Sequence, residues 1–134
     1  MSSTDLGQSW QAISPDLTRN VPALLGSSGG PITKDNTGVE YYCTIFAAFE
    51  SPLEEGLIWC GSDDGLVHVS TDDGETWNNV TPPDLPANSQ ITMLAESPHT
   101  EGTVYMTVAR HKEGDYAPYV YRTTDLGQSW TQIG

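Results

Sequence analysis

Apolar residues occur along the chain in short runs, each bounded by Gly, Pro, Asp or Asn. No window of about 11–18 residues carries a convincing helical period, so the pattern does not predict an amphipathic helix. Short apolar runs between turn-forming residues are typical of β-strands. The pattern therefore predicts an all-β protein.

The runs form two sets of four predicted strands. The first set covers residues 41–49, 57–61, 66–70 and 76–81, and the second covers 91–96, 103–109, 119–124 and 129–133. Four antiparallel strands repeated in tandem are typical of β-propeller blades. A spare outer strand is expected at 8–13. We thus expect an outer strand with its turn (1–13), a long loop (14–40), a first blade (41–81) and a second blade (82–134).

The long loop should contain one short helical turn. Residues 16–20 could form that turn, with Ser14 or Asp16 as its cap. The remainder of 14–40 is predicted to be an ordered loop. A connection of this length in a compact domain is usually functional or mobile.

An octapeptide, called the box below, occurs three times: STDLGQSW at 3–10, STDDGETW at 70–77 and TTDLGQSW at 123–130. Its Asp can accept hydrogen bonds from the backbone N–H groups that follow, and its Gly can adopt a positive φ angle. Its Trp begins the next strand and should be largely buried. The residues assigned this structural role, with no catalytic residue among them, are Ser3, Asp5, Gly7, Trp10, Ser70, Asp72, Gly74, Trp77, Thr123, Asp125, Gly127 and Trp130.

A second repeat has the same tandem arrangement. The tripeptide Glu-Ser-Pro at residues 50–52 recurs at 96–98, and each copy is followed by Glu-Gly. After each copy come an apolar run, a loop, another apolar run and a box. The chain is therefore predicted to be built from two equivalent units.

The box resembles the Asp-box, or bacterial neuraminidase repeat, of sialidases, some glucan-cleaving hydrolases, photosystem assembly factors and sortilin-type receptors. The stretch from Ser14 to Trp130 resembles large secreted or periplasmic proteins called sortilin-like or glycosyl-hydrolase-like. The segments that carry this resemblance are ISPDLTRN at 13–20, GGPITKDNTGVEYYCTIFA at 29–47, GSDDGLVHVSTDDGETW at 61–77 and PYVYRTTDLGQSW at 118–130. The resemblance implies a propeller with each box at the turn between the third and fourth strands. It also implies a secreted or periplasmic parent, although the N-terminus shows no signal-peptide pattern.

The two ends of the chain match each other closely. Residues 4–10 and 124–130 are both TDLGQSW, which suggests an excised or engineered two-blade unit with overlapping ends. Two blades leave two broad faces uncovered, so we expect several copies to close one ring with an even number of blades. A tetramer is favoured, with a trimer or pentamer as alternatives. The spare strand at 8–13 should either complete a neighbouring copy's blade or be displaced by its duplicate.

The net charge of the chain limits the kinds of partner that it is expected to bind. Eighteen acidic residues oppose five basic ones, for a formal net charge of −13. Nucleic acid and anionic membranes both require a basic face, so neither is an expected partner. The expected partner is a second copy of the chain.

Residues that could bind a ligand or catalyse a reaction are expected only in the loops at the rim opposite the boxes. Peptide or glycan binding there is the first alternative function, and a fragment of an Asp-box glycoside hydrolase is the second. Sialidase activity is not expected, because the chain lacks the Arg-Ile-Pro signature. Neither a metal nor a cofactor is predicted, because the His residues show no ligand spacing with a Cys. The possible ligand residues on this rim are Asp35, Asn36, Asp63, Asp64, Arg110, His111 and Tyr116.

The two cysteines are predicted to be free. A hairpin turning near residue 53 places Cys60 opposite Phe46 and Cys43 opposite Asp63. The thiols are then too far apart for a disulfide bond, and both should be mostly buried.

Overall fold

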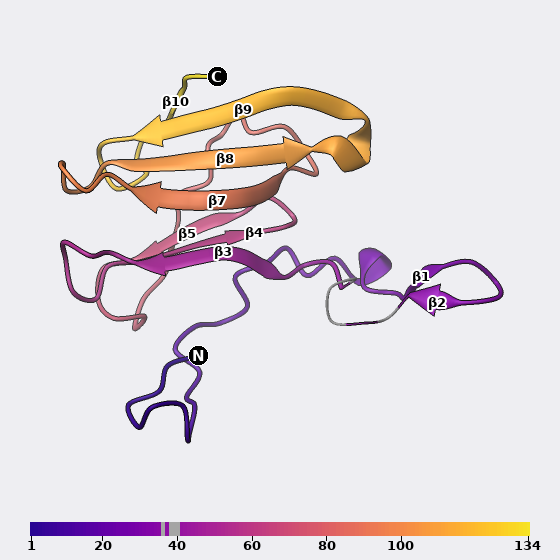
Figure 1. Cartoon of the computed structure of the whole chain (residues 1–134), viewed down its shortest axis with the longest axis horizontal. Helices are drawn as coiled ribbons and strands as arrows, with labels where there is room; N and C mark the ends of the chain where they lie inside the picture. Colours follow the sequence, from indigo (N-terminus) through magenta and orange to yellow (C-terminus); the bar gives the residue numbers. More distant parts are fainter. Residues whose placement is uncertain (36, 38–40) are drawn as a thin grey trace.

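The computed structural model describes residues 1–35, 37 and 41–134. Its regular structure consists of two four-stranded antiparallel sheets that lie one above the other in Figure 1. Strands that follow one another in the sequence are neighbours within each sheet. The first sheet contains β3 (Ile45–Glu50), β4 (Ile58–Ser62), β5 (Val67–Ser70) and β6 (Asn78–Asn79), and the second contains β7 (Gln90–Glu96), β8 (Val104–Arg110), β9 (Asp115–Thr123) and β10 (Thr131–Gln132). The predicted all-β class and the two propeller blades are confirmed.

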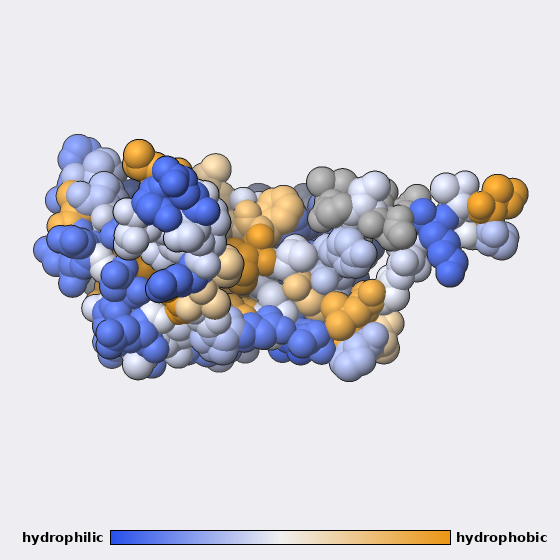
Figure 2. All heavy atoms as spheres, turned by 90° about the horizontal axis from the view of Figure 1, so that it is seen from below, coloured by the Kyte–Doolittle hydropathy of each residue, from blue (hydrophilic) through white to orange (hydrophobic). Residues whose placement is uncertain are grey.

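The segment before the first blade is more structured than a plain loop. It carries a 3-10 helix, η1 (Pro22–Leu24), and a hairpin of β1 (Ser28–Gly29) and β2 (Lys34–Asp35) that projects from the body in Figures 1 and 2. The helical turn expected at 16–20 is wrong. The Asp16 Oδ1 atom instead accepts the Thr18 N–H at 3.0 Å, and Asn20 has a φ of 46°, which a right-handed helix excludes.

Several strands are shorter than predicted. The first strand of blade one begins at Ile45 rather than residue 41, because Cys43 has a φ of 62° and the ladder carries a bulge between Ile45 and Ala47. Both outer strands, β6 and β10, are two residues long. Conversely, the expected loop 110–118 forms a 3-10 turn, η2 (His111–Glu113), after which β9 begins at Asp115.

The cysteines are free, as predicted, but the predicted register is wrong by two residues. Cys60 pairs with Ala48 rather than Phe46, because the turn between Glu50 and Ile58 is centred on residue 54 rather than on residue 53. Cys60 is buried and Cys43 is only half-buried. Burial raises the pKa of the Cys60 thiol to about 11, against a smaller lowering from the amino terminus.

The spare strand predicted at 8–13 is not part of either sheet. Among the described residues, its backbone forms one isolated antiparallel bridge, between Ser2 and Gln11. This N-terminal segment lies below the first blade in Figure 1.

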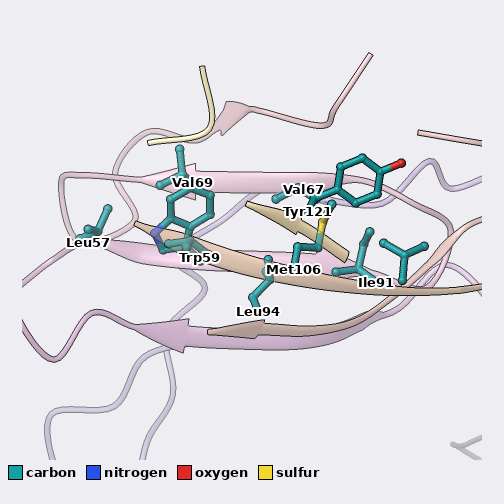
Figure 3. Close-up of a cluster of buried hydrophobic side chains, with 10 residues drawn as sticks. Leu57, Trp59, Val67, Val69, Ile91, Leu94, Met106 and Tyr121 are labelled. Carbon is teal, nitrogen blue, oxygen red and sulfur yellow. The ribbon is translucent and has the colours of Figure 1, made fainter. Parts of the chain in front are cut away.

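The core lies between the two blades (Figure 3). Leu57, Trp59, Val67 and Val69 of the first blade meet Ile91, Leu94, Met106 and Tyr121 of the second, and all are buried. The approach is closest at Gly61, where a Cβ atom would lie 2.4 Å from Cγ2 of Ile91. Glycine at this position therefore sets the distance between the blades.

Each blade also has an outer face that no other blade covers. On blade one this face carries Ile45, Phe46 and Cys60, and on blade two it carries Met93 and Tyr105. Ile45, Phe46, Met93 and Tyr105 are 42%, 56%, 56% and 39% exposed. Seen from the side of the N-terminal segment, apolar side chains form patches among polar ones (Figure 2).

No helix within the described residues is long and apolar enough to cross a membrane.

Candidate functional site

Each box is a closed hydrogen-bonded turn. In the middle box, Oδ1 of Asp72 accepts the backbone N–H of Thr76 at 2.8 Å, and Oδ2 accepts the Thr76 hydroxyl at 2.5 Å. The Ser70 hydroxyl donates to Asp72 at 2.8 Å and accepts the N–H of Gly74 at 2.8 Å. Asp5 and Asp125 make the same bonds in their own turns.

The turn needs two consecutive residues with positive φ, not one. Gly74 has a φ of 89° and Asp73, just before it, has a φ of 58°. Leu6 and Leu126 occupy the same position in the outer boxes with φ angles of 59° and 55°. Sequence reasoning missed this residue, because its side chain varies among the three boxes and nothing but its position marks it.

Hydrogen bonding holds the box carboxylates ionised. The Ser9 hydroxyl and then the Ser9 N–H lower the pKa of Asp5 to about 2. The same two donors on Thr76 and on Ser129 lower the pKa of Asp72 and of Asp125. Acceptance of several N–H and O–H groups favours the charged form of a carboxyl group.

The box tryptophans join one blade to the next. Trp130 Nε1 donates to the main-chain oxygen of Val80 at 2.7 Å, and Trp77 Nε1 donates to that of Ile13 at 2.9 Å. Val80 and Ile13 occupy equivalent positions, each three residues after the preceding box Trp. This bond from a box Trp to the preceding outer segment is called the indole joint below.

The box glycines lie at the same joint. A Cβ atom on Gly127 would lie 2.7 Å from Cβ of Val80, and one on Gly74 would lie 2.9 Å from the oxygen of Ile13. No side chain larger than hydrogen fits there without displacing the neighbour. The glycine is thus needed both for its backbone angle and for contact between blades.

The expected burial of the box Trp side chains is wrong for Trp10. Trp10 is 58% exposed, whereas Trp77 and Trp130 are half-buried. Trp10 Nε1 donates only to Gly7 O within its own turn, at 3.1 Å. Trp77 and Trp130 are covered by the outer segments that contain Ile13 and Val80, whereas no described residue bonds the Trp10 indole from outside its own turn.

A second candidate site is a hollow of about 170 Å³ at the opposite rim, where four loops meet. It is lined by Leu24, Tyr42, Asp63, Asn88, Gln90, Ala109, Lys112 and Glu113. The two most buried polar residues among them are Asp63 and Gln90, 5% and 8% exposed. Oδ2 of Asp63 and the Gln90 amide form no hydrogen bond with a described residue, so both have capacity for a ligand.

The acidic pair in the turn between β4 and β5 mainly fixes the long loop. Asp63 Oδ1 accepts the Thr44 N–H at 2.8 Å, and Asp64 Oδ2 accepts the Arg19 N–H at 2.7 Å. Asp64 also accepts the Ser62 hydroxyl, and its main-chain oxygen accepts Arg19 Nε at 2.9 Å. Asp64 is therefore fully engaged within the fold, and only Asp63 contributes to the hollow.

The remaining predicted rim residues are dispersed. Arg110 forms an ion pair with Asp115 and donates to Ala87 O at 3.3 Å. His111 is exposed in η2 but does not line the hollow, and Tyr116 is 83% exposed in β9. Asn36 and the side chain of Asp35 lie outside the described residues.

Several residues of the hollow were not predicted. Gln90 begins a buried strand, and a polar residue there is the signal that could have identified it. Lys112 lies over the Tyr42 ring, 5.7 Å from its centroid, in a cation–π contact. Within the part of the chain that the structure describes, no three metal-binding side chains converge.

Two antiparallel sheets pack face to face, and the box turns at 70–77 and 123–130 are each joined to the outer segment before them. This arrangement defines a pair of β-propeller blades. Among solved structures, an ancestral GH74 enzyme superposes with a TM-score of 0.52 at 20% identity, covering 69% of this chain and 13% of that one. YCF48 from Cyanidioschyzon merolae superposes with a TM-score of 0.47 at 23% identity, covering 67% and 23%. The likeness to the GH74 enzyme supports the propeller fold.

Sequence comparison relates the chain to part of two fungal proteins. Over 86 residues it is 35% identical to a probable oligoxyloglucan-reducing end-specific xyloglucanase of Neosartorya fischeri. Over 85 residues it is 33% identical to an oligoxyloglucan-reducing end-specific xyloglucanase of Emericella nidulans. Each match covers 62% of this chain and 10% of the relative, so the chain spans about a tenth of their length. No family model matches the chain.

Proposed function

We propose that the chain is a non-catalytic pair of propeller blades whose role is to associate with further copies and close a ring. The indole joint is the observation that carries this proposal. It is made at Trp77 and at Trp130, whereas Trp10 Nε1 donates only to Gly7 O of its own turn. In each copy, the Trp10 indole therefore makes no bond to an earlier segment. Each blade also has one uncovered outer face with exposed apolar side chains.

Native mass measurement tests this proposal. Since each copy supplies two blades, a closed ring contains an even number, and we expect three, four or five copies of the 14.5 kDa chain, with four favoured. One discrete mass is expected because a ring has a fixed copy number. A folded chain with a strictly monomeric mass at micromolar concentration would contradict the proposal, as would a continuous ladder of masses.

Three observations support the non-catalytic part of the proposal. Asp64 is committed to the Arg19 N–H and the Ser62 hydroxyl, and Asp63 to the Thr44 N–H. Asp64 is thus fully engaged and Asp63 has one open oxygen, so the two do not form a pair of free carboxylates of the kind that glycoside hydrolysis needs. In addition, the chain spans about a tenth of the xyloglucanases that it resembles.

Ligand binding at the rim hollow is a second candidate function. The free Asp63 oxygen and the Gln90 amide favour it, because together they can accept from and donate to a hydroxyl-bearing ligand. The names of the relatives point to a xyloglucan oligosaccharide as the probe. Calorimetric titration should show binding that weakens about tenfold in Lys112→Ala, the loss expected for one charged hydrogen bond.

Lys34→Ala is the matched control, because Lys34 lies on the projecting hairpin away from the hollow. Equal weakening in both variants would contradict a site at the hollow. Release of reducing sugar during the titration would contradict the non-catalytic assignment.

A further inference from the structure

We infer that the hollow at the rim binds the guanidinium group of an arginine side chain in a peptide, with Asp63 as the anionic acceptor. This arginine site rests on the second candidate function, ligand binding at the hollow, and names the class of ligand that binds there.

Two polar side chains that line the hollow are more than nine-tenths buried and have unused bonding capacity. Asp63 and Gln90 are 5% and 8% exposed. Oδ1 of Asp63 accepts the Thr44 N–H at 2.8 Å, whereas Oδ2 and the Gln90 amide bond to no described residue. A buried carboxylate oxygen without a donor is costly. It therefore favours a ligand that supplies both N–H groups and positive charge.

The loops that carry Asp63 and Gln90 are fixed against each other. The Asp63 N–H donates to Thr44 O at 3.0 Å, and its Oδ1 accepts the Thr44 N–H in return. Two residues later, a Cβ atom on Gly65 would lie 2.8 Å from the oxygen of Ser89, the residue just before Gln90. Because the two acceptors are pre-organised, little further ordering is needed when a ligand binds.

The charges around the hollow favour a cation. Burial, and then the carboxylates of Asp64 and Asp63, raise the pKa of the Tyr42 hydroxyl, against a smaller lowering from Arg19. The Tyr42 ring already binds one cation, since Lys112 Nζ lies 5.7 Å from its centroid. A cationic ligand is therefore attracted to this part of the rim.

The size and lining of the hollow suit one side-chain head group. Its volume is about 170 Å³, whereas sites that enclose drug-sized ligands are about 300–1,000 Å³. A guanidinium group is planar with five N–H donors, so it can bond to more than one acceptor. Leu24 and Ala109 add apolar surface, against which the methylene groups of an arginine can pack. A sugar hydroxyl offers a single donor and no charge, so it would use less of this site.

An NMR titration tests the arginine site. The probe is the blocked tripeptide acetyl-Gly-Arg-Gly-amide in about 0.15 M salt, where charges more than about 8 Å away are largely screened. We expect saturable shifts that include the side-chain amide of Gln90. The same peptide with citrulline in place of arginine keeps the shape without the charge. It should bind at least about tenfold more weakly.

Three variants locate the site. Asp63→Asn should weaken binding of the arginine peptide at least about tenfold, because it removes the charge while its Oδ1 can still accept the Thr44 N–H. Glu55→Gln is the matched control, since it removes an acidic charge from the turn between β3 and β4, where Glu55 is exposed. Lys112→Ala should strengthen binding about two- to fivefold, because it removes a like charge from the hollow. That change has the opposite sign to the one expected for an oligosaccharide.

The outcomes separate the ligand class from the site itself. Equal weakening in Asp63→Asn and Glu55→Gln, or equal binding of the two peptides, would overturn the arginine site, as would weaker binding in Lys112→Ala. Binding of a xyloglucan oligosaccharide at Gln90 without binding of the arginine peptide would also overturn it, and would leave the second candidate function standing. No shift at the hollow with either ligand would overturn both. The citrulline peptide and Lys112→Ala keep the test decisive if Asp63→Asn fails to fold, which circular dichroism would show.

Discussion

At the scale of single residues, the box carboxylates make folding sensitive to acid. The pKa of Asp5 is about 2 in the folded box, against about 3.9 for an unperturbed Asp. The unfolded chain therefore binds a proton first as the pH falls. The stabilising contribution of Asp5 is complete above about pH 4 and is lost progressively toward about pH 2.

Asp5 lies in the N-terminal turn, outside both four-stranded sheets, so the effect should be measured locally rather than as global unfolding. We expect the amide resonance of Ser9 to titrate with a midpoint near pH 2, because its N–H donates to the carboxylate at 2.9 Å. Asp5→Asn should remove this titration. A midpoint near pH 4 for Ser9 would show that the box carboxylate is not held by its turn.

At the scale of the elements, Gly61 of β4 determines how closely the two blades pack. Gly61→Ala places a methyl group against Ile91, 2.4 Å from Cγ2 as the blades stand. We expect a loss of about 1–3 kcal/mol in the free energy of unfolding, the usual cost of overpacking a core. Urea denaturation measures this loss.

Two further variants identify the cause. Gly30→Ala is the matched control, because a Cβ atom there meets nothing within 4 Å. Adding Ile91→Ala to Gly61→Ala should recover part of the loss relative to the sum of the single changes, because the two side chains compete for one space. Strict additivity of the two substitutions would contradict the packing explanation.

At the scale of the whole molecule, the proposed ring depends on the uncovered faces of the two blades. Tyr105→Glu places a charge on the open face of blade two and should shift the native mass of the ring to that of the monomer, because an unpaired charge would be buried between copies. Tyr116→Glu is the matched control, since Tyr116 is 83% exposed on the rim. Circular dichroism should show that both variants keep the fold.

The sequence predicted the architecture because tandem repetition fixes the number and order of the strands. Both blades and all three box turns follow from the spacing of residues such as Asp72 and Trp77. The register of the first hairpin could not be predicted, because residues 51–57 include several turn-forming residues and the apolar pattern does not fix which of them is the centre of the turn. The exposure of Trp10 was missed for another reason: its burial depends on a neighbouring segment, which the box sequence does not describe.

The indole joint points one way along the chain, since Trp77 and Trp130 each donate to the segment before their own box. In a ring built on this joint, no copy has a free end, and one copy can leave only when the joints on both its sides open together. In an open row of copies, the terminal copy leaves after a single opening. Subunit exchange between differently labelled rings should therefore be far slower than the loss of a copy from an open row, so that a ring keeps the chains with which it was first assembled.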